Sequence, residues 1–301
     1  MRAALLPDRS VLKVAGDNAR NFLHGLVTAD IRNLAAGEAR FCALLTPQGK
    51  IIADFIVAEA PAKDGGGFFI DVAHERAGPL VEKLNLYKLR AKIIVEDLSA
   101  ILGVLAAWDG PRRAAQPGDS VGLGYPDPRL LALGLRVMLP PHLFRAAAGE
   151  LGAAIVTADE YETHRIALGI PRGGVDFHYD DAFPHEADMD QLGGVDFEKG
   201  CYVGQEVVSR MEHRGTARTR AVPVSFEGTE PPPGSTVVAG DRQLGLIGSA
   251  AAGKAVALLR LDRVADAVAR GEALMAGATP IRLIQPDWAR FTVPGQRKAA
   301  E

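Results

Sequence analysis

Hydrophobic residues in the first two thirds of the chain recur with two periods, one typical of strands and one typical of helices. Strands are expected over residues 10–15, 40–46, 50–57, 68–72, 90–96, 101–107 and 130–139. Helices are expected over residues 75–88, 141–151 and 159–168, and another from Gly16 with Asp17 as its N-cap. Hairpin turns such as Pro47-Gln48-Gly49 separate several of these strands, so the predicted class is α+β and not a doubly wound sheet.

The last third of the chain has a different pattern, with short alternating runs between glycine and proline turns. Strands are expected over residues 221–226, 236–239, 244–249, 255–261 and 281–284. This spacing predicts a small antiparallel β-barrel. The expected domains are therefore residues 1–218, a C-terminal barrel over 219–290 and a frayed tail over 291–301. Irregular connections are expected over 109–128 and over 173–199, and the second, long and polar, is expected to line a site.

Composition narrows the functional classes. The chain has 301 residues, 48% hydrophobic and 24% charged, with a net charge of −3, as in a globular protein without a dedicated nucleic-acid surface. Its two cysteines, Cys42 and Cys201, are too few for a disulfide scaffold or for holding an iron–sulfur cluster alone. No apolar run approaches the roughly 20 residues of a membrane span, and no signal peptide is recognisable, so a cytoplasmic protein is expected.

The main candidate for chemistry is Cys201, within residues 199–206 (Lys-Gly-Cys-Tyr-Val-Gly-Gln-Glu). Gly200 and Gly204 around it indicate a turn. If residues 206–212 form a helix, Cys201 lies at or near its N-terminus. There, unpaired N–H groups and the nearby Lys199 would favour a thiolate. The alternative is a small buried cysteine packed in a turn.

This eight-residue motif resembles the signature of the YgfZ family, which is related to the T-protein (aminomethyltransferase) of the glycine cleavage system. The resemblance continues through residues 16–17, 25–30, 165–171, 183–187 and 191–194, so it covers essentially the whole chain. It implies a three-part assembly: two intertwined α+β subdomains around a central cavity, followed by the barrel.

The resemblance also implies that the cavity binds tetrahydrofolate. The expected folate contacts are Tyr161, Arg165, Glu186, Gln205, Glu206 and Tyr202. Arg165 could pair with a carboxylate of the glutamate tail, while Glu186 and Gln205 could bind the pteridine edge. An alternative remains open in which Tyr161 packs in the core and Arg165 forms an ordinary ion pair.

One position departs from the T-protein pattern. T-proteins carry an Asp-Asp pair in this hairpin, and the first Asp serves the amine chemistry. Here the first position is Ala53, so only Asp54 remains. Because alanine can neither accept a proton nor hydrogen-bond an amine, aminomethyl transfer is not expected.

The function expected from the motif and the resemblance is a tetrahydrofolate-binding accessory protein for assembly or repair of 4Fe–4S clusters. Cys201 would be its working thiol, supported by Lys199. Its partners would be iron–sulfur assembly proteins and client enzymes, including tRNA-modifying ones, without direct nucleic-acid or membrane contact. The alternatives are a folate-dependent one-carbon transferase and an interaction scaffold with a vestigial pocket.

No resident metal is expected. One polar group could bind a metal in principle. Its spacing matches no common ligand pattern, so a solvated loop is expected there. The group consists of His178, Asp180, Asp181, His185, Glu186 and Asp188.

Overall fold

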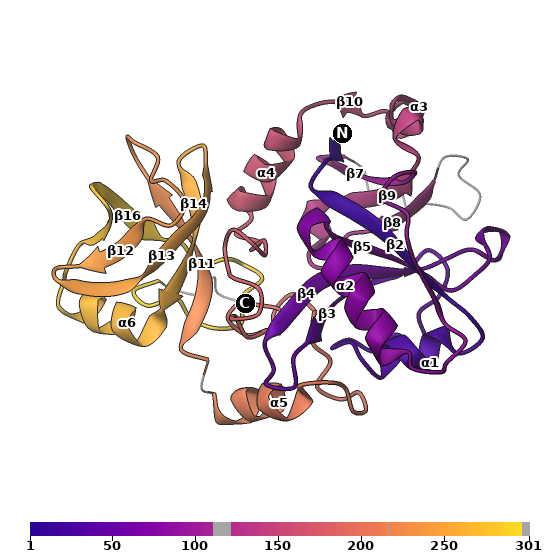
Figure 1. The fold of residues 1–301 in the computed structure, drawn as a ribbon. Coiled ribbons are helices and arrows are strands. Elements are labelled where there is room, and N and C mark those ends of the chain that lie inside the picture. Colours follow the sequence, from indigo (N-terminus) through magenta and orange to yellow (C-terminus); the bar gives the residue numbers. More distant parts are fainter. Residues whose placement is uncertain (111–121, 216, 297–301) are drawn as a thin grey trace. The chain divides into compact units, whose positions relative to one another are not determined.

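The structure is a computed structural model that describes residues 1–110, 122–215 and 217–296. Two compact units divide the chain (Figure 1). Unit 1 comprises Met1–Tyr161 and Leu192–Gln205, and unit 2 comprises Glu162–Gln191 and Glu206–Glu301. The chain therefore returns to unit 1 for one short segment, the segment that contains Cys201.

Unit 1 contains two five-stranded sheets. The first has the order β3-β4-β5-β2-β6, with every neighbouring pair antiparallel. Its strands are β2 (Arg9–Ala15), β3 (Ala39–Leu45), β4 (Ile51–Glu59), β5 (Phe68–Ala73) and β6 (Ile94–Asp97). Helix α2 (His74–Tyr87) buries Ala77, Leu80 and Leu84 in the same apolar core as this sheet, as its helical hydrophobic spacing predicts.

The second sheet of unit 1 has the order β10-β1-β7-β9-β8. Its pairs are antiparallel except for β1 with β10, which are parallel. Helix α3 (Phe144–Glu150) buries Ala147 and Ala148 in the core of this sheet. The strands are β1 (Arg2–Leu6), β7 (Gly103–Trp108), β8 (Leu123–Pro126), β9 (Leu135–Leu139) and β10 (Ala154–Ile155).

A buried ion network connects the two sheets of unit 1. Arg136 on β9 donates to Asp71 on β5 at 2.5 Å and to Asp127 at 2.8 Å, while Arg9 on β2 donates to the other oxygen of Asp71 at 2.6 Å. The carboxylates of Asp71 and Asp127 are fully buried, so their charges are balanced by guanidinium groups and not by water.

Unit 2 is built around a closed barrel of order β11-β14-β13-β12-β15-β16. Its pairs are antiparallel, and β11 closes the barrel against β16. Helix α6 (Leu261–Ala269) adds Val264 and Ala267 to the barrel core. The strands are β11 (Thr219–Phe226), β12 (Thr236–Ala239), β13 (Arg242–Ala251), β14 (Lys254–Arg260), β15 (Leu274–Ala276) and β16 (Thr279–Leu283).

The remaining regular elements are short or connect the units. Helices α4 and α5 each span a boundary between units. No helix within the described residues is long and apolar enough to cross a membrane. These elements are α1 (Ala19–His24), α4 (Ala158–Ala167), α5 (Gln205–Arg214) and the 3₁₀ turns η1 (Ala62–Asp64), η2 (Leu131–Leu133) and η3 (Pro141–Leu143).

The α+β class and the antiparallel C-terminal barrel are confirmed. Several details were wrong. Helix α1 begins at Ala19 with Asn18 at its N-cap, so Asp17 does not cap it. Strand β6 begins only at Ile94, because the chain turns after α2 and Leu89 adopts a left-handed φ of 47°. The strand expected over 130–139 begins at Leu135, after the turn η2. The pattern missed β1, β8, β10, β15 and α6.

The domain boundaries 1–218, 219–290 and 291–301 stay a prediction. Part of the connection expected over 109–128, residues 111–121, lies outside the described residues, as do residues 297–301 of the expected frayed tail.

Candidate functional site

Cys201 lies on a loop of unit 1 that packs against the hairpin of β3 and β4. Gly204 makes this packing possible, because its φ is +82° and a Cβ there would lie 2.6 Å from the Thr46 carbonyl oxygen. The same Cβ would lie 3.1 Å from the Cα of Gly49 in the hairpin turn. Only glycine fits both the backbone angle and the close approach, which explains the second glycine of the motif.

Residues 25–30 anchor the other end of this loop. The Thr28 hydroxyl donates to the Gly194 carbonyl at 2.6 Å and accepts from the Ala43 amide of β3 at 2.8 Å. The Asp196 amide donates to the Thr28 carbonyl at 2.9 Å. The anchoring segment, residues 25–30, is one of the stretches that carried the family resemblance.

Lys199 is the strongest link between the loop and the anchoring segment. Its buried ammonium group donates to three carbonyl oxygens, those of His24 at 2.7 Å, Val27 at 2.5 Å and Ala29 at 3.0 Å. It also lies 5.1 Å from the centre of the Tyr202 ring, within the range of a cation–π contact. Burial lowers the pKa of Lys199 to about 8. Lys199 thus holds the loop in place, and its predicted role of supporting a thiolate stays a prediction.

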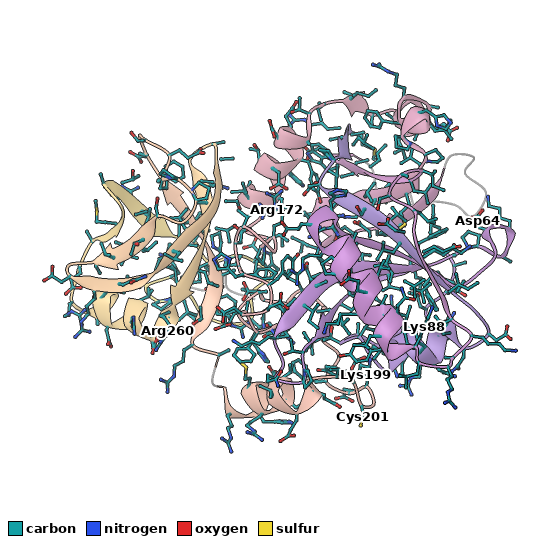
Figure 2. The ribbon with its side chains drawn as sticks, in the orientation of Figure 1. Asp64, Lys88, Arg172, Lys199, Cys201 and Arg260 are labelled. Atoms are coloured by element: carbon teal, nitrogen blue, oxygen red, sulfur yellow. The ribbon has the colours of Figure 1, made fainter. Side chains whose placement is uncertain are left out.

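The two cysteines lie in opposite environments. Cys201 is exposed, and Figure 2 shows its sulfur pointing away from the ribbon. Cys42 is fully buried in the core of the first sheet, and burial raises the pKa of its thiol well above the ordinary value. Cys201 is therefore not the small buried cysteine that was the alternative for this position.

The predicted helix after the motif is present as α5, but Cys201 precedes its first residue, Gln205, by four positions. A loop therefore carries the thiol. The helix dipole acts mainly within the first turn of α5, and Cys201 lies before that turn.

Tyr161 has the core role that the sequence left open. It is 3% exposed, and its hydroxyl accepts a hydrogen bond from Arg136 at 3.2 Å. Its ring packs edge-to-face on Trp108 with 5.3 Å between centroids. These contacts are all within unit 1, and they use the polar end of Tyr161 that a folate would need.

Arg165 likewise takes the ion-pair role. Its side chain is 2% exposed and belongs to unit 2. The guanidinium group donates to Asp176 at 2.9 Å, Glu162 at 2.8 Å and the Ser249 hydroxyl at 2.8 Å. With its nitrogens engaged in this way, Arg165 holds the loop after α4 against strand β13 of the barrel.

The other expected folate contacts differ in exposure. Glu186 accepts a hydrogen bond from the Phe183 amide at 2.9 Å, and Glu206 is exposed and pairs with Arg210 at 2.7 Å. Gln205 is the first residue of α5 and is half-buried. Tyr202 is buried, and its hydroxyl has no hydrogen-bond partner among the described residues. Burial raises the pKa of Tyr202 to about 12.

Ala53 lies on β4 with no exposed surface, in the apolar core beside the buried Cys42. It pairs with Leu44 across the hairpin, while the following Asp54 pairs with Ala43 and is 8% exposed. The position that carries the first Asp in T-proteins is therefore part of a hydrophobic core in this chain.

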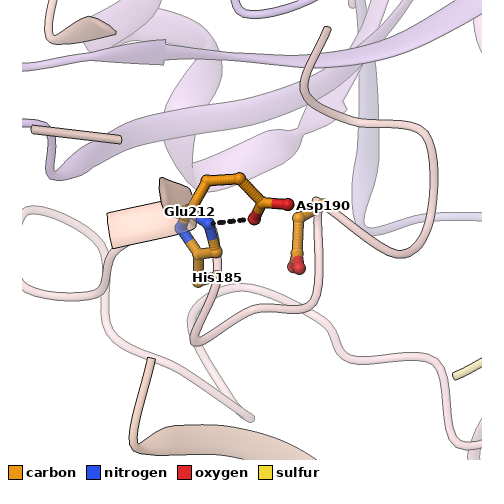
Figure 3. A group of neighbouring side chains, drawn as sticks. All are labelled: His185, Asp190 and Glu212. Carbon is orange, nitrogen blue, oxygen red and sulfur yellow. Dashed lines mark hydrogen bonds and ion pairs between the residues drawn. The ribbon is translucent and has the colours of Figure 1, made fainter. Parts of the chain in front are cut away.

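The structure also brings together a polar group that the sequence did not indicate. Ligand atoms of His185, Asp190 and Glu212 all lie within 4.8 Å of one another (Figure 3). Of these three residues, only His185 belongs to the polar group that the sequence analysis considered as a metal site. Glu212 was missed because it lies on α5, 27 residues after His185, and no spacing pattern connects the two.

The fold defines the class of protein. It is similar to the aminomethyltransferase T of the glycine cleavage system from Bartonella henselae, with a TM-score of 0.73 over 95% of this chain and 86% of that chain. The identity is 17%, so the likeness is one of fold. Residues 218–291 match the family described as CAF17, C-terminal beta-barrel domain. The chain thus has a T-protein-like α+β fold with a closed antiparallel C-terminal barrel.

The relatives are more specific. The chain is 35% identical over 244 residues to the "Iron-sulfur cluster assembly factor IBA57 homolog, mitochondrial" of Mycosarcoma maydis, and 34% identical over 221 residues to that of Pyricularia oryzae. These alignments cover 77% and 72% of this chain, and the chain spans 59% and 56% of the length of these relatives. The chain is a homologue of these factors, and the name YgfZ stays a prediction.

These relatives also correct one expectation. A cytoplasmic location was expected from the cysteine usage and from the absence of a recognisable targeting segment. That expectation is contradicted, because the relatives are named as mitochondrial proteins. The number of cysteines does not distinguish the cytoplasm from another reducing compartment.

Proposed function

We propose that this protein takes part in the assembly or repair of 4Fe–4S clusters and that Cys201 is its working thiol. The observation that carries the proposal is the exposure of Cys201 on a loop that Lys199 and Gly204 fix from both sides. The relatives named as iron–sulfur cluster assembly factors support the same role.

A single exposed thiol limits what the protein does with a cluster. A 4Fe–4S cluster usually takes four thiolates, and the second cysteine, Cys42, is buried in the core. Cys201 therefore supplies one ligand, and a partner supplies the others. Such a shared site suits transient delivery or repair better than permanent storage. Clients that modify tRNA fit this scheme without any contact between this chain and nucleic acid.

Tetrahydrofolate binding is the second part of the proposal, and the T-protein-like fold supports it. Tyr161 and Arg165 are engaged in the cores of their units, so the contacts proposed here are Tyr202 and Gln205, which both belong to unit 1. The buried Tyr202 hydroxyl without a protein partner supports a role in ligand binding, since buried polar groups are normally hydrogen-bonded.

The Cys201→Ser variant tests the first part. In cells that lack the native protein, it should fail to restore the activity of 4Fe–4S enzymes, because a serine hydroxyl is a poor ligand for iron in a cluster. The control is Cys42→Ala, which removes the other sulfur and should restore activity as long as the protein stays folded. Restoration by Cys201→Ser to the native level would show that the thiol has no part in the function.

Calorimetry with tetrahydrofolate tests the second part. The native protein should bind it saturably, and Tyr202→Phe should weaken binding about 2- to 10-fold, the effect of one hydrogen bond. No turnover of tetrahydrofolate to its methylene form is expected, because Ala53 stands in the core where T-proteins have the first Asp. Absence of heat at millimolar folate would contradict folate binding and would favour an interaction scaffold.

A further inference from the structure

The polar group of unit 2 in Figure 3 consists of His185 and Asp190 from the loop before α5 and Glu212 from α5 itself. The Nε2 atom of His185 lies 3.0 Å from the Oε2 atom of Glu212. His185 and Asp190 are buried, whereas the Glu212 side chain is 42% exposed. The group thus combines a buried imidazole and a buried carboxylate with the partly exposed carboxylate of Glu212, which can move.

Among the described residues, two guanidinium groups contact this region, and one of them, that of Arg290, donates to the backbone carbonyl oxygen of Asp190 at 2.8 Å. Arg220 on β11 donates to both oxygens of Asp190, at 2.5 and 2.9 Å, and to the Oδ1 atom of Asp188 at 3.2 Å. Two buried carboxylates therefore converge on one guanidinium group, with the carboxylate of Glu212 nearby.

Asp188 gives an independent indication that a cation is needed. Asp188 has no exposed surface, and its Oδ2 atom has no hydrogen-bond partner among the described residues. A buried carboxylate oxygen without a partner is costly, so either a proton or a cation balances this site.

The three donors suit a metal ion of a particular kind. One imidazole nitrogen with two carboxylate oxygens is typical of sites for Zn²⁺, Fe²⁺ or Mn²⁺, while Ca²⁺ and Mg²⁺ prefer oxygen ligands alone. Asp190 can keep Arg220 and still bind a metal, because an ionised carboxylate offers about four lone-pair sites. Arg220 would then orient this ligand from behind, as outer partners of metal ligands commonly do.

We propose that His185, Asp190 and Glu212 form a site for a divalent first-row transition metal, separate from Cys201. Ligands that share such an ion at about 2.0–2.2 Å lie roughly 3–4 Å apart, so the present separations of up to 4.8 Å need only a small closure. The exposed side chain of Glu212 can provide it. On binding, the ion takes the place of the hydrogen bond between His185 and Glu212.

The test uses the full chain with Cys201→Ser, because an exposed thiol would itself bind the probe metals. Zn²⁺ is titrated by calorimetry, and Co²⁺ is followed by its visible absorption, which reports its coordination. Saturable 1:1 binding is expected. Glu212→Gln should weaken it by at least about tenfold, since changing even an outer partner of a metal ligand costs that much.

The matched control is Glu206→Gln, which changes an exposed carboxylate on the same helix, paired with Arg210, and should leave the metal affinity unchanged. Circular dichroism shows whether each variant is folded. Two results would overturn the proposal: equal affinities of Glu212→Gln and its parent, or no saturable binding at millimolar metal. Neither result bears on the role of Cys201.

Discussion

Two neighbours of Cys201, Lys199 and Gly204, do most to fix the position of its loop. Lys199 brings a positive charge to three backbone carbonyl oxygens and to the ring of Tyr202. Gly204 lets the loop lie directly on the hairpin turn at Thr46 and Gly49. Lys199 and Gly204 of the motif therefore hold in place the loop that carries the Cys201 thiol.

Gly204→Ala is predicted to destabilise unit 1 by about 2–4 kcal/mol. About 1–2 kcal/mol comes from a left-handed φ on a residue with a Cβ, and the rest from overpacking against Thr46 and Gly49. Gly37→Ala is the control, because Gly37 has the same φ of +82° with no atom within 4 Å of the added Cβ. It should cost only the first part, as measured by urea unfolding. Equal losses in the two variants would contradict the close approach.

At the scale of elements, Arg136 on β9 fastens one sheet of unit 1 to the other through Asp71 on β5. Burial raises the pKa of Asp71, but the guanidinium groups of Arg9 and Arg136 outweigh burial and hold it below its ordinary value. Strands far apart in the sequence are thus joined by charges that must stay ionised for the pairing to hold.

Asp71→Asn is predicted to lower the free energy of unfolding by about 3–5 kcal/mol at pH 7, since it removes the carboxylate that Arg9 and Arg136 share and leaves Arg136 with Asp127. The folded pKa of Asp71 lies below the unfolded value of about 4, so its contribution is fully present above that pH and falls as the pH drops further. The stability difference between native protein and variant should therefore narrow below about pH 4.

Unfolding titrations in urea between pH 3 and 7 measure this difference. The exposed Glu96 on β6 provides a control, and Glu96→Gln should stay within about 0.5 kcal/mol of the native protein at pH 7. A constant gap between Asp71→Asn and the native protein across this pH range would show that the Asp71 charge is not what joins the sheets.

At the scale of the whole molecule, much of the architecture could be predicted because its signals are local. The β3–β4 hairpin and most barrel strands have alternating residues and glycine or proline turns. Strand β15 was missed because three residues are too few to show a period, and β1 because residues 1–7 were weighed only as a possible leader. Helix α6 was missed because its start directly continues the apolar run of β14.

The site was harder to predict than the fold. Cys201 and its glycines stand together in the sequence, so the loop could be expected. The acceptors of Lys199 lie 170 to 175 residues away, and no local pattern shows where its ammonium group points. The same holds for Tyr161, whose partner Arg136 lies on β9, for the contact of Arg165 with Ser249 on β13, and for Glu212 beside His185. The partners of charged groups depend on how the fold brings distant segments together. The family resemblance predicted that arrangement only in outline.

The return of residues 192–205 to unit 1 affects how the protein is made. A ribosome adds roughly 5–20 residues per second, so residues 1–161 emerge a few seconds before the segment that completes their unit. Until then, the carbonyl groups of His24, Val27 and Ala29 lack the Lys199 ammonium. The nascent chain thus acquires its anchored sulfur only when the segment with Lys199 and Cys201 has been made, and a polypeptide truncated before this segment lacks the exposed thiol.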